Sequence, residues 1–485
     1  MTELKRTMIK DLSEKKGEEV MIKGWADTVR AQGKMAFFDF RDTSGKVQGV
    51  VFGKPEVLEV AKTVRPEFVL EVRGIVNERN DRVAKEAAEK FAETGVKDFF
   101  IKDVEIEITD IKILNEAETP VFDIKEDTRN INEETRLKYR YLDLRSERMK
   151  KNLEARHKIF NFVRNYFNDR DFLEIETPLF SKATPEGARD FLVPARLHPG
   201  KFYALPQSPQ QYKQLLMASG IEKYFQFAKS MRDEDLRGDR QPEFTQMDLE
   251  MAFATEEDIM EINEKLLIEL VEKLYPEKKI QEIPFPRISY KEAMEKYGND
   301  RPDIREDKND PNLLAFAWIV DFPFFEKTSD SDDPQAQGEW TFTHNPFSMP
   351  KEKDLEKLMK GENIGEIMAA QYDIVLNGFE IGGGSVRAHK PEILKKTLSI
   401  LGHSDEKIEK NFGHMLSAFA KGTPPHAGIA WGADRLVMIL QNEPNIREVI
   451  AFPKTREARD PMLDSPAEVS DEQLKELSIK LDLEK

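Results

Sequence analysis

Cysteine is absent from this chain of 485 residues. A chain without cysteine has no disulfide bonds, no thiolate zinc site and no cysteine nucleophile. Its seven histidines are scattered and never form the HExxH spacing that holds zinc on one face of a helix. These absences argue against a zinc hydrolase and against a cysteine-dependent enzyme.

Long apolar runs and glycine-rich phosphate loops are missing as well. No stretch is long enough to span a bilayer, and the first residues, MTELKRTMIK, lack the apolar segment of a signal peptide. We therefore expect a cytoplasmic protein that has no membrane partner. No βαβ repeat with a glycine phosphate loop occurs, which argues against a Rossmann or P-loop domain.

The charge balance is negative, at −17. This argues against binding nucleic acid through bulk positive charge, but it leaves a local basic patch open. A composition with 39% hydrophobic and 34% charged residues is typical of a globular protein, and the length allows two or three domains.

Residues 1–118 are β-rich. Five strands are predicted, at 20–29, 36–42, 46–52, 68–76 and 104–114. One short helix is predicted over 56–64, between the third strand and the fourth. This inventory matches an OB-fold barrel. A charged surface helix is expected over 82–93.

Four residues fall on or beside different strands of this unit: Arg30, Phe37, Gln48 and Glu105. OB barrels bind single-stranded nucleic acid by stacking bases on aromatic rings and by reading base edges with polar side chains. Packing in the core explains Phe37 equally well. Because Phe38 points the other way, one of this pair should be exposed.

The rest of the chain is expected to form an α+β domain over 146–470, after a polar, irregular hinge at 119–145 and before a C-terminal tail at 471–485. An amphipathic helix is predicted from Arg148 to Asn168. The short strand in FLEIETP follows it and ends at Pro178.

The block from Gln207 to Glu250 has the densest polar pattern. Ser208 as N-cap and Pro209 as first helical residue predict a helix with Gln210, Lys213 and Gln214 on one face. Downstream, period-two alternation places Gln246, Asp248 and Glu250 on one side of a strand. A preceding strand carries Arg232 into a charged loop. This pattern suits a small, phosphorylated, zwitterionic ligand.

The segment YDIVLNGFEIGGGSVRAH predicts a hairpin that turns at Asn377-Gly378. In the simplest register Leu376 faces Phe379, Val375 faces Glu380 and Asp373 faces Gly382. Asp373 and Glu380 would then be diagonal neighbours about 7 Å apart, able to share Mg²⁺ with substrate phosphates. Taken alone, a solvated hairpin explains the segment better.

Two arginines complete the candidate anion ligands. Arg387 follows the glycine run of this hairpin, where close approach of a ligand is possible. Arg435 lies in the first turn of a helix that follows a strand in HAGIAWGADRLVMILQ. The helix dipole and the guanidinium would therefore attract an anion together. A surface salt bridge is the plainer explanation of Arg435.

Taken together, these segments resemble the class II aminoacyl-tRNA synthetases. FLEIETP resembles motif 1, the stretch from Met231 to Glu250 motif 2, and GIAWGADR motif 3. ATPEGARDFLVP, QSPQQYKQLLM, RQPEFTQMD and GGGSVR are similar to the bacterial-type aspartyl-tRNA synthetase family over nearly the whole chain. The resemblance implies an N-terminal OB-fold anticodon domain, a catalytic domain on an antiparallel sheet with flanking helices, and a homodimer built through motif 1.

The resemblance also implies an activity and the residues that perform it. Aspartate would be activated with ATP and transferred to the 3′-hydroxyl of tRNA-Asp, with tRNA-Asn left open as a second substrate. It implies that ATP is bound by Arg232, Glu234, Glu380 and Arg435, and that Mg²⁺ is bound by Asp373 and Glu380. It implies that aspartate is bound by Glu186, Gln210, Lys213, Gln246, Asp248, His344 and Arg387. Of these, Lys213 and Arg387 would bind its side-chain carboxylate. Arg30, Phe37, Gln48 and Glu105 match anticodon-contacting positions.

Several departures from the family pattern stand out. Bacterial-type relatives usually carry a large inserted domain between motifs 2 and 3, where this chain has only the short segment 286–315. Asn345 replaces a second histidine beside His344, and Ala430 stands where a glycine is common. Gln32 lies in the loop that affects reading of the third anticodon base, and the sequence leaves charging of tRNA-Asn open.

Three other functions compete with this one. An asparaginyl-tRNA synthetase is opposed by the paired cations Lys213 and Arg387, because a neutral amide would leave charge unpaired. A non-catalytic tRNA-binding relative would be expected to lack Arg232, Glu380 or Arg435. An amino-acid-activating enzyme that does not use tRNA would have no need of the OB-like unit.

Overall fold

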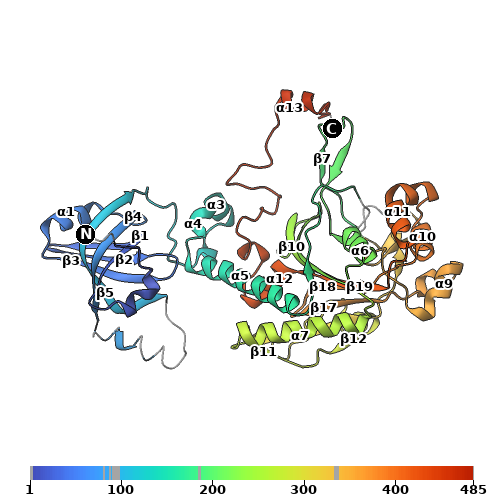
Figure 1. The fold of residues 1–485 in the computed structure, drawn as a ribbon, viewed down its shortest axis with the longest axis horizontal. Coiled ribbons are helices and arrows are strands. Elements are labelled where there is room, and N and C mark those ends of the chain that lie inside the picture. The colour runs from blue at the N-terminus through green and yellow to red at the C-terminus, as the bar shows by residue number, and fades with distance from the viewer. Residues whose placement is uncertain are drawn as a thin grey trace. The chain divides into compact units, whose positions relative to one another are not determined.

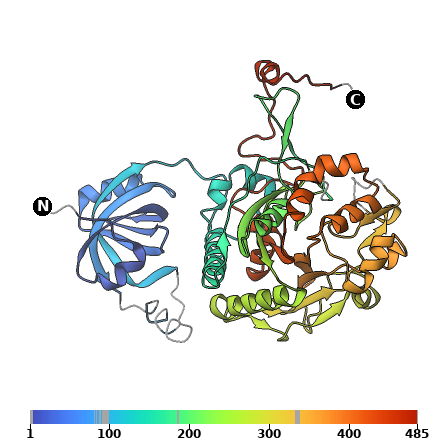
Figure 2. The same cartoon turned by 45° about the vertical axis from the view of Figure 1, so that its right-hand side comes forward.

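The computed structural model describes residues 4–79, 82, 84–86, 89, 99–183, 187–331 and 338–483. They form two compact units, Met1–Asp123 and Ile124–Lys485 (Figures 1 and 2). The barrel encloses one hydrophobic cluster, and the second unit has a large cluster around its main sheet and two smaller ones.

The first unit is a closed five-stranded barrel with the strand order β1-β2-β3-β5-β4. Its strands are β1 (Glu19–Gln32), β2 (Met35–Arg41), β3 (Lys46–Phe52), β4 (Val69–Glu78) and β5 (Phe100–Asn115), and α1 (Pro55–Thr63) lies between β3 and β4. Alternating residues such as Phe38 and Phe40 fill the interior. The predicted OB-fold is confirmed. Most of the helix expected over 82–93 lies outside the described residues.

The prediction of an irregular hinge over 119–145 is wrong for its second half. This stretch holds η2 (Thr128–Asn130), α3 (Glu133–Lys138) and α4 (Arg140–Asp143). Arg136 and Arg140 are buried, and Arg136 pairs with Glu448 at 2.9 Å while Arg140 donates to the carbonyl of Arg447. Its polar composition therefore reflects buried ion pairs.

The second unit is built on an eight-stranded sheet in the order β12-β14-β17-β18-β19-β10-β9-β6. Its strands are β6 (Leu173–Glu174), β9 (Lys223–Met231), β10 (Glu243–Ala252), β12 (Arg287–Ser289), β14 (Phe316–Val320), β17 (Gln371–Leu376), β18 (Phe379–Val386) and β19 (His426–Gly432). All neighbours are antiparallel except the outermost pairs, β12–β14 and β6–β9. The antiparallel sheet expected of the catalytic domain is confirmed.

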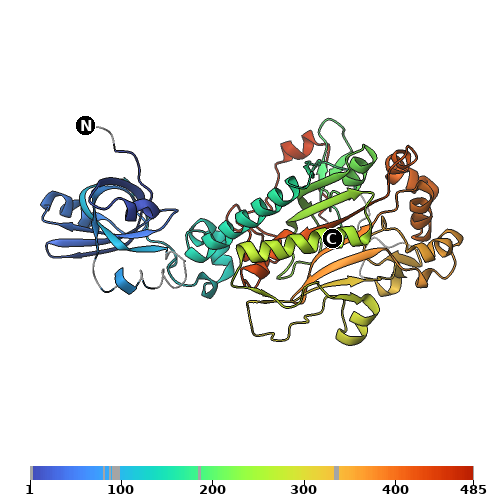
Figure 3. The same ribbon diagram turned by 60° about the horizontal axis from the view of Figure 1, so that its bottom comes forward.

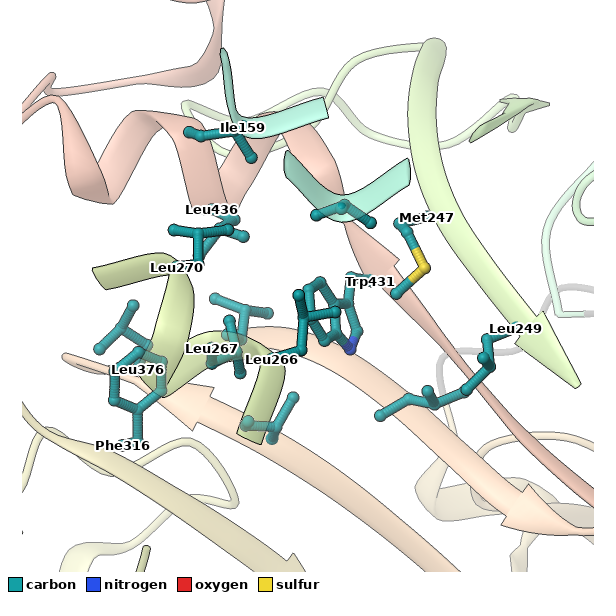
Figure 4. Close-up of a cluster of buried hydrophobic side chains, with 14 of the residues drawn as sticks. Ile159, Met247, Leu249, Leu266, Leu267, Leu270, Phe316, Leu376, Trp431 and Leu436 are labelled. Atoms are coloured by element: carbon teal, nitrogen blue, oxygen red, sulfur yellow. The ribbon is translucent and has the colours of Figure 1, made fainter. Parts of the chain in front are cut away.

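Three helices pack on one face of this sheet: α5 (Glu147–Asn168), α7 (Glu256–Leu274) and α12 (Ala433–Leu440). α5 and α7 run side by side (Figure 3). Leucines of α7 and Leu436 of α12 lie near Trp431 of β19 and Met247 of β10 (Figure 4). Because residues alternate along a strand, the same packing turns the polar residues of β10 to the opposite face.

The remaining elements belong to the second unit, except the first 3₁₀ turn, which belongs to the barrel unit. They are α6 (Gln210–Ala218), α8 (Tyr290–Tyr297), α9 (Leu355–Lys360), α10 (Pro391–Ile400), α11 (Asp405–Phe419), α13 (Asp471–Glu476), β7 (Leu192–Pro194), β8 (Phe202–Ala204), β11 (Lys279–Ile280), β13 (Leu313–Leu314), β15 (Phe325–Lys327) and β16 (Trp340–Phe342), with short 3₁₀ turns η1 (Ile9–Glu14), η3 (Thr328–Asp330), η4 (Glu352–Asp354), η5 (Ile364–Glu366) and η6 (Ile446–Glu448). α13 lies beside the β7–β8 hairpin, where Glu476 pairs with Arg196 at 3.3 Å (Figures 1 and 2). In the described part of the chain no helix is long and apolar enough to cross a membrane.

Two local predictions need correction. α6 begins at Gln210 with Pro209 as N-cap, one residue later than predicted, although Ser208 Oγ still accepts from the Gln210 N–H at 3.3 Å. In the β17–β18 hairpin, Leu376 faces Phe379 and Val375 faces Glu380 as predicted, but Asp373 faces Gly383 instead of Gly382. A β-bulge at this point gives β18 one extra residue, which shifts the rest of the register.

Candidate active site

The floor of the site is a group of four buried charges. Lys213 Nζ from α6 lies 2.9 Å from Asp248 Oδ2 and 3.1 Å from Glu250 Oε2, and Arg387 Nε lies 3.0 Å from Glu250 Oε1. All four side chains are at most 2% exposed. A side chain on Gly428 of β19 would collide with the Glu250 carboxylate, so glycine is required there.

The two carboxyls of this group differ in their pKa. Burial raises the pKa of Asp248 to about 6, against the attraction of Lys213. Burial acts on Glu250 too, but Arg387 and Lys213 together hold its pKa below the ordinary value. Oδ1 of Asp248 is buried without a hydrogen-bond partner among the described residues. Since Asp248 lines the pocket, this oxygen is available to a cationic group of a ligand.

The β17–β18 hairpin brings two more carboxylates together. A Cβ on Gly383 would meet Asp373 Oδ1 at 2.8 Å and Glu380 Oε1 at 3.7 Å, so both side chains point to the same side of the hairpin. Burial and the neighbouring Glu380 raise the pKa of Asp373 well above its ordinary value. Such a pair gains stability from a nearby cation.

The donor set suits Mg²⁺ that is shared with a phosphorylated ligand. Mg²⁺ is usually bound by one or two carboxylates together with waters and substrate phosphates. Among the residues described, no cluster of three or more His, Cys, Asp or Glu side chains could form an all-protein metal cage. Asp373 and Glu380 fit the shared arrangement. His344 Nδ1 lies 3.6 Å from Asp373 Oδ2, and burial lowers the pKa of His344, which favours the neutral ring.

Arg232 and Arg435 lie on the lining of the same pocket. Arg232 follows β9, stacks over the Phe244 ring at 5.2 Å and donates to the carbonyl of Gln207 at 3.4 Å. Arg435 lies in the first turn of α12, donates to the Glu380 carbonyl and lies 3.1 Å from Asp239 Oδ2. Two guanidinium groups that line one pocket with a carboxylate pair are suited to a polyphosphate.

The predicted site residues come together. One pocket is lined by Gln210, Lys213, Arg232, Glu234, Gln246, Asp248, His344, Asp373, Glu380, Arg387 and Arg435. Gln246 is partly engaged by Ser230, whose hydroxyl donates to Gln246 Oε1 at 2.7 Å. Glu234 pairs with Arg240 at 3.5 Å. Glu186 lies outside the described residues.

Sequence reasoning gave no role to Glu250, which pairs with both buried cations. Its position on the polar face of β10 was the available signal, because it alternates with Gln246 and Asp248. Asp239, the partner of Arg435, and Gln371, which also lines the pocket, carried no local pattern. Their proximity arises only from the fold.

In the barrel, the four candidate nucleic-acid contacts form two cross-strand pairs. Arg30 of β1 faces Phe37 of β2, and Gln48 of β3 faces Glu105 of β5. Phe38 is buried whereas Phe37 is partly exposed, so the ring outside the core is Phe37. Gln48 Nε2 lies 3.5 Å from Glu105 Oε2.

Comparison with known families gives two matches. Residues 132–456 match the family of tRNA synthetases class II (D, K and N), and residues 20–114 match the OB-fold nucleic acid binding domain. Aspartate–tRNA ligases of the Staphylococcus aureus strains NCTC 8325 / PS 47 and Newman are 38% identical over 96% of this chain and 97% of their own. The alignment extends over 594 positions, more than the 485 residues present here, so the relatives carry residues without a counterpart in this chain.

Solved structures share the fold. Entamoeba histolytica asparaginyl-tRNA synthetase in complex with asparaginyl-adenylate has a TM-score of 0.73, with 22% identity over 94% of this chain and 99% of that one. Aspartyl-tRNA synthetase of the same organism has a TM-score of 0.69, with 22% identity over 93% and 92%. At this identity the likeness concerns the fold alone.

Proposed function

The chain belongs to the aspartate–tRNA ligases within the class II tRNA synthetases (D, K and N), and on this premise we propose how its own residues join L-aspartate to tRNA. In the first step the aspartate α-carboxylate attacks the α-phosphorus of ATP and releases pyrophosphate. In the second step a hydroxyl of the terminal tRNA adenosine attacks the mixed anhydride. Both steps require orientation and charge neutralisation more than covalent help from the protein.

The buried charge group that contains Lys213, Asp248, Glu250 and Arg387 carries the assignment of aspartate. Arg387 has five N–H donors, of which Glu250 accepts two and Ser385 Oγ accepts one at 2.8 Å. One N–H on each terminal nitrogen therefore remains for a ligand. Together with the third N–H of Lys213, they would bind the side-chain carboxylate of aspartate.

The ammonium of aspartate would bind beside these cations. Asp248 offers the unpartnered Oδ1, and Gln210 and Gln246 line the pocket next to it. Glu186, which lies outside the described residues, is proposed to contact the same substrate, and so is His344. Ammonium and carboxylate would thereby be fixed at two points, which orients the α-carboxylate towards the nucleotide.

ATP would occupy the opposite part of the pocket. Arg232 would neutralise charge on the α-phosphate, Arg435 would bind the distal phosphates, and Glu234 would contact the nucleotide. Asp373 and Glu380 would hold Mg²⁺, which when bound supplies further positive charge beside the phosphates. Glu380 thus takes part in both nucleotide and metal binding.

The barrel would bind the anticodon. We propose that a base stacks on Phe37 while Arg30, Gln48 and Glu105 read base edges and backbone, which is supported by the cross-strand pairing of these residues. A homodimer is proposed as well, supported by the exposed apolar side chains Leu173, Leu179 and Phe180 in and after β6.

Side-by-side measurements test this function. ATP–pyrophosphate exchange should depend on aspartate and be orders of magnitude weaker with asparagine, because the amide NH₂ would face the N–H donors of Lys213 and Arg387 where a carboxylate oxygen would accept from them. Exchange that prefers asparagine would favour the asparaginyl enzyme instead. Charging of purified tRNA-Asp and tRNA-Asn then shows whether the second tRNA is also a substrate.

A further inference from the structure

A buried histidine lies behind the pocket. His426 is the first residue of β19 and has no exposed surface. Its Nδ1 lies 2.8 Å from the carbonyl of Pro424, and its Nε2 lies 3.1 Å from Gln214 Nε2 on α6. The His426 carbonyl also accepts from the Arg387 N–H at 2.9 Å. His426 therefore connects α6, which carries Gln210 and Lys213, to Arg387 in the segment after β18.

The polarity of this contact is determined by the Pro424 carbonyl. A carbonyl can only accept, so His426 Nδ1 must carry a proton. In a neutral imidazole the other nitrogen, Nε2, is then an acceptor. Burial lowers the pKa of His426 and favours this neutral form, although Glu250 acts in the opposite direction; Arg387 and His389 lower it further. Gln214 must consequently present its NH₂ group to the ring.

The same polarity continues to the pocket. With its NH₂ turned to His426, Gln214 presents Oε1 to Gln210, whose Nε2 donates to it at 3.0 Å. Gln214 is completely buried, whereas Gln210 lines the pocket. The Gln210 amide therefore has its NH₂ engaged, and its Oε1 is the end left for a ligand.

We propose that His426 is a positioning residue that acts through Gln214 to fix the Gln210 amide with its acceptor oxygen towards the ammonium of aspartate. The inference rests on the proposed function, since it needs aspartate in this pocket. An inverted amide would present NH₂ to the ammonium and repel it. Free rotation of the amide would lose part of the binding and leave the nucleotide side of the pocket unchanged.

The relay is tested by ATP–pyrophosphate exchange with His426→Phe, which fills the space but removes the acceptor. KM for aspartate should rise roughly tenfold, the size expected for one hydrogen bond to a charged group, with kcat and KM for ATP unchanged. Phe419→Leu is the matched control, because the Phe419 ring lies edge-on to His426 with centroids 6.3 Å apart and takes no part in the relay. This control should leave all three constants unchanged.

A double-mutant cycle separates the relay from a merely structural role. In a Gln210→Met background, His426→Phe should raise KM for aspartate no further, because the group that it positions is already gone. The inference would be overturned if the increase in KM for aspartate in the double variant equalled the product of the increases in the two single variants. If His426→Phe does not fold, Gln214→Met interrupts the same relay at its centre, and the same cycle with Gln210→Met applies.

The two proposals fail in different ways. Unchanged KM for aspartate in a folded His426→Phe protein, while the unsubstituted protein exchanges normally, overturns only the relay. Failure of the unsubstituted protein to exchange with aspartate overturns the proposed function and the relay with it.

Discussion

Lys213 and Arg387 are cations that the fold has already paired with carboxylates, yet each has more N–H donors than those carboxylates use. Buried charges of this kind are stable only when they are paired and hydrogen-bonded. Asp248 and Glu250 therefore allow the two cations to be buried away from water. The remaining N–H donors of these cations can then discriminate a carboxylate from an amide, because a carboxylate accepts at both oxygens whereas an amide would turn its NH₂ towards a donor.

Arg387→Ala should lose aspartate activation by orders of magnitude while ATP binding stays nearly intact. The guanidinium is the proposed carboxylate ligand, whereas the phosphate ligands Arg232 and Arg435 lie on other elements. Aspartate-dependent ATP–pyrophosphate exchange measures the first effect, and calorimetric titration with ATP the second.

Arg387→Lys is the informative companion variant. It keeps the charge that balances Glu250 but loses the planar fork, so it should remain folded and still activate aspartate poorly. Near-normal exchange in Arg387→Ala would contradict the assignment of this residue.

The protonation of Asp248 makes aspartate binding sensitive to acid. Its pKa in the folded protein is about 6, above the ordinary 3.8, so the folded state takes up this proton before the unfolded state does as the pH falls. The resulting stabilisation is fully present below the unfolded pKa and is lost as the pH rises through 6. Protonation of Asp248 in acid should therefore weaken aspartate binding but should not destabilise the folded protein.

KM for aspartate should consequently rise as the pH falls through 6, because protonated Asp248 no longer attracts the ammonium. Initial rates of exchange across this range, at saturating ATP, measure the effect. Asp248→Asn should show a high KM at every pH and lose this inflection. An inflection that persists in Asp248→Asn would assign the titration to another group of the pocket, such as His344.

At the scale of elements, regular patterns were predictable from sequence and their irregularities were not. Period-two alternation placed Gln246, Asp248 and Glu250 on one face of β10, and Asn377-Gly378 identified the hairpin turn. The bulge in β18 and the one-residue shift of α6 were not predicted. No local pattern in the sequence marks either irregularity.

Pairings between distant residues were beyond sequence reasoning for the same reason. Arg387 and Glu250 are 137 residues apart, and Arg435 and Asp239 are 196 apart. The resemblance to the family motifs identified Arg387 and Arg435 as candidate ligands, because both lie in recognisable segments. It did not reveal which carboxylates hold them, because that depends on the strand order of the sheet.

Gly383 of β18 provides a prediction at this scale. Gly383→Ala would place a Cβ 2.8 Å from Asp373 Oδ1 and displace one of the two proposed Mg²⁺ ligands. The Mg²⁺ concentration that half-saturates ATP–pyrophosphate exchange should rise several-fold, while KM for aspartate stays unchanged. The contacts are to the ends of side chains, so thermal unfolding should shift little. An unaltered Mg²⁺ requirement would separate the hairpin from metal binding.

At the scale of the whole molecule, the barrel and the second unit have no hydrophobic cluster in common among the described residues. The barrel core and the sheet core are separate clusters, and the boundary between the units falls at residue 123. Adenylate chemistry would need only the second unit, since every pocket residue belongs to it. Removal of residues 1–123 should therefore spare aspartate-dependent ATP–pyrophosphate exchange and cripple tRNA charging, because the proposed anticodon contacts are lost.

The position of the cut is itself a test. A shorter piece that begins at residue 146 lacks Arg136 and Arg140, which would leave Glu448 buried with Arg148 as its only remaining ion-pair partner among those described. Arginine pairing holds the pKa of Glu448 at about 2, and breaking a buried pair typically costs about 3–5 kcal/mol. Urea unfolding should find the 124–485 piece clearly more stable than the 146–485 piece. Equal stability would mean that α3 and α4 are a linker after all, and undiminished charging by the 124–485 piece would remove the barrel from tRNA recognition.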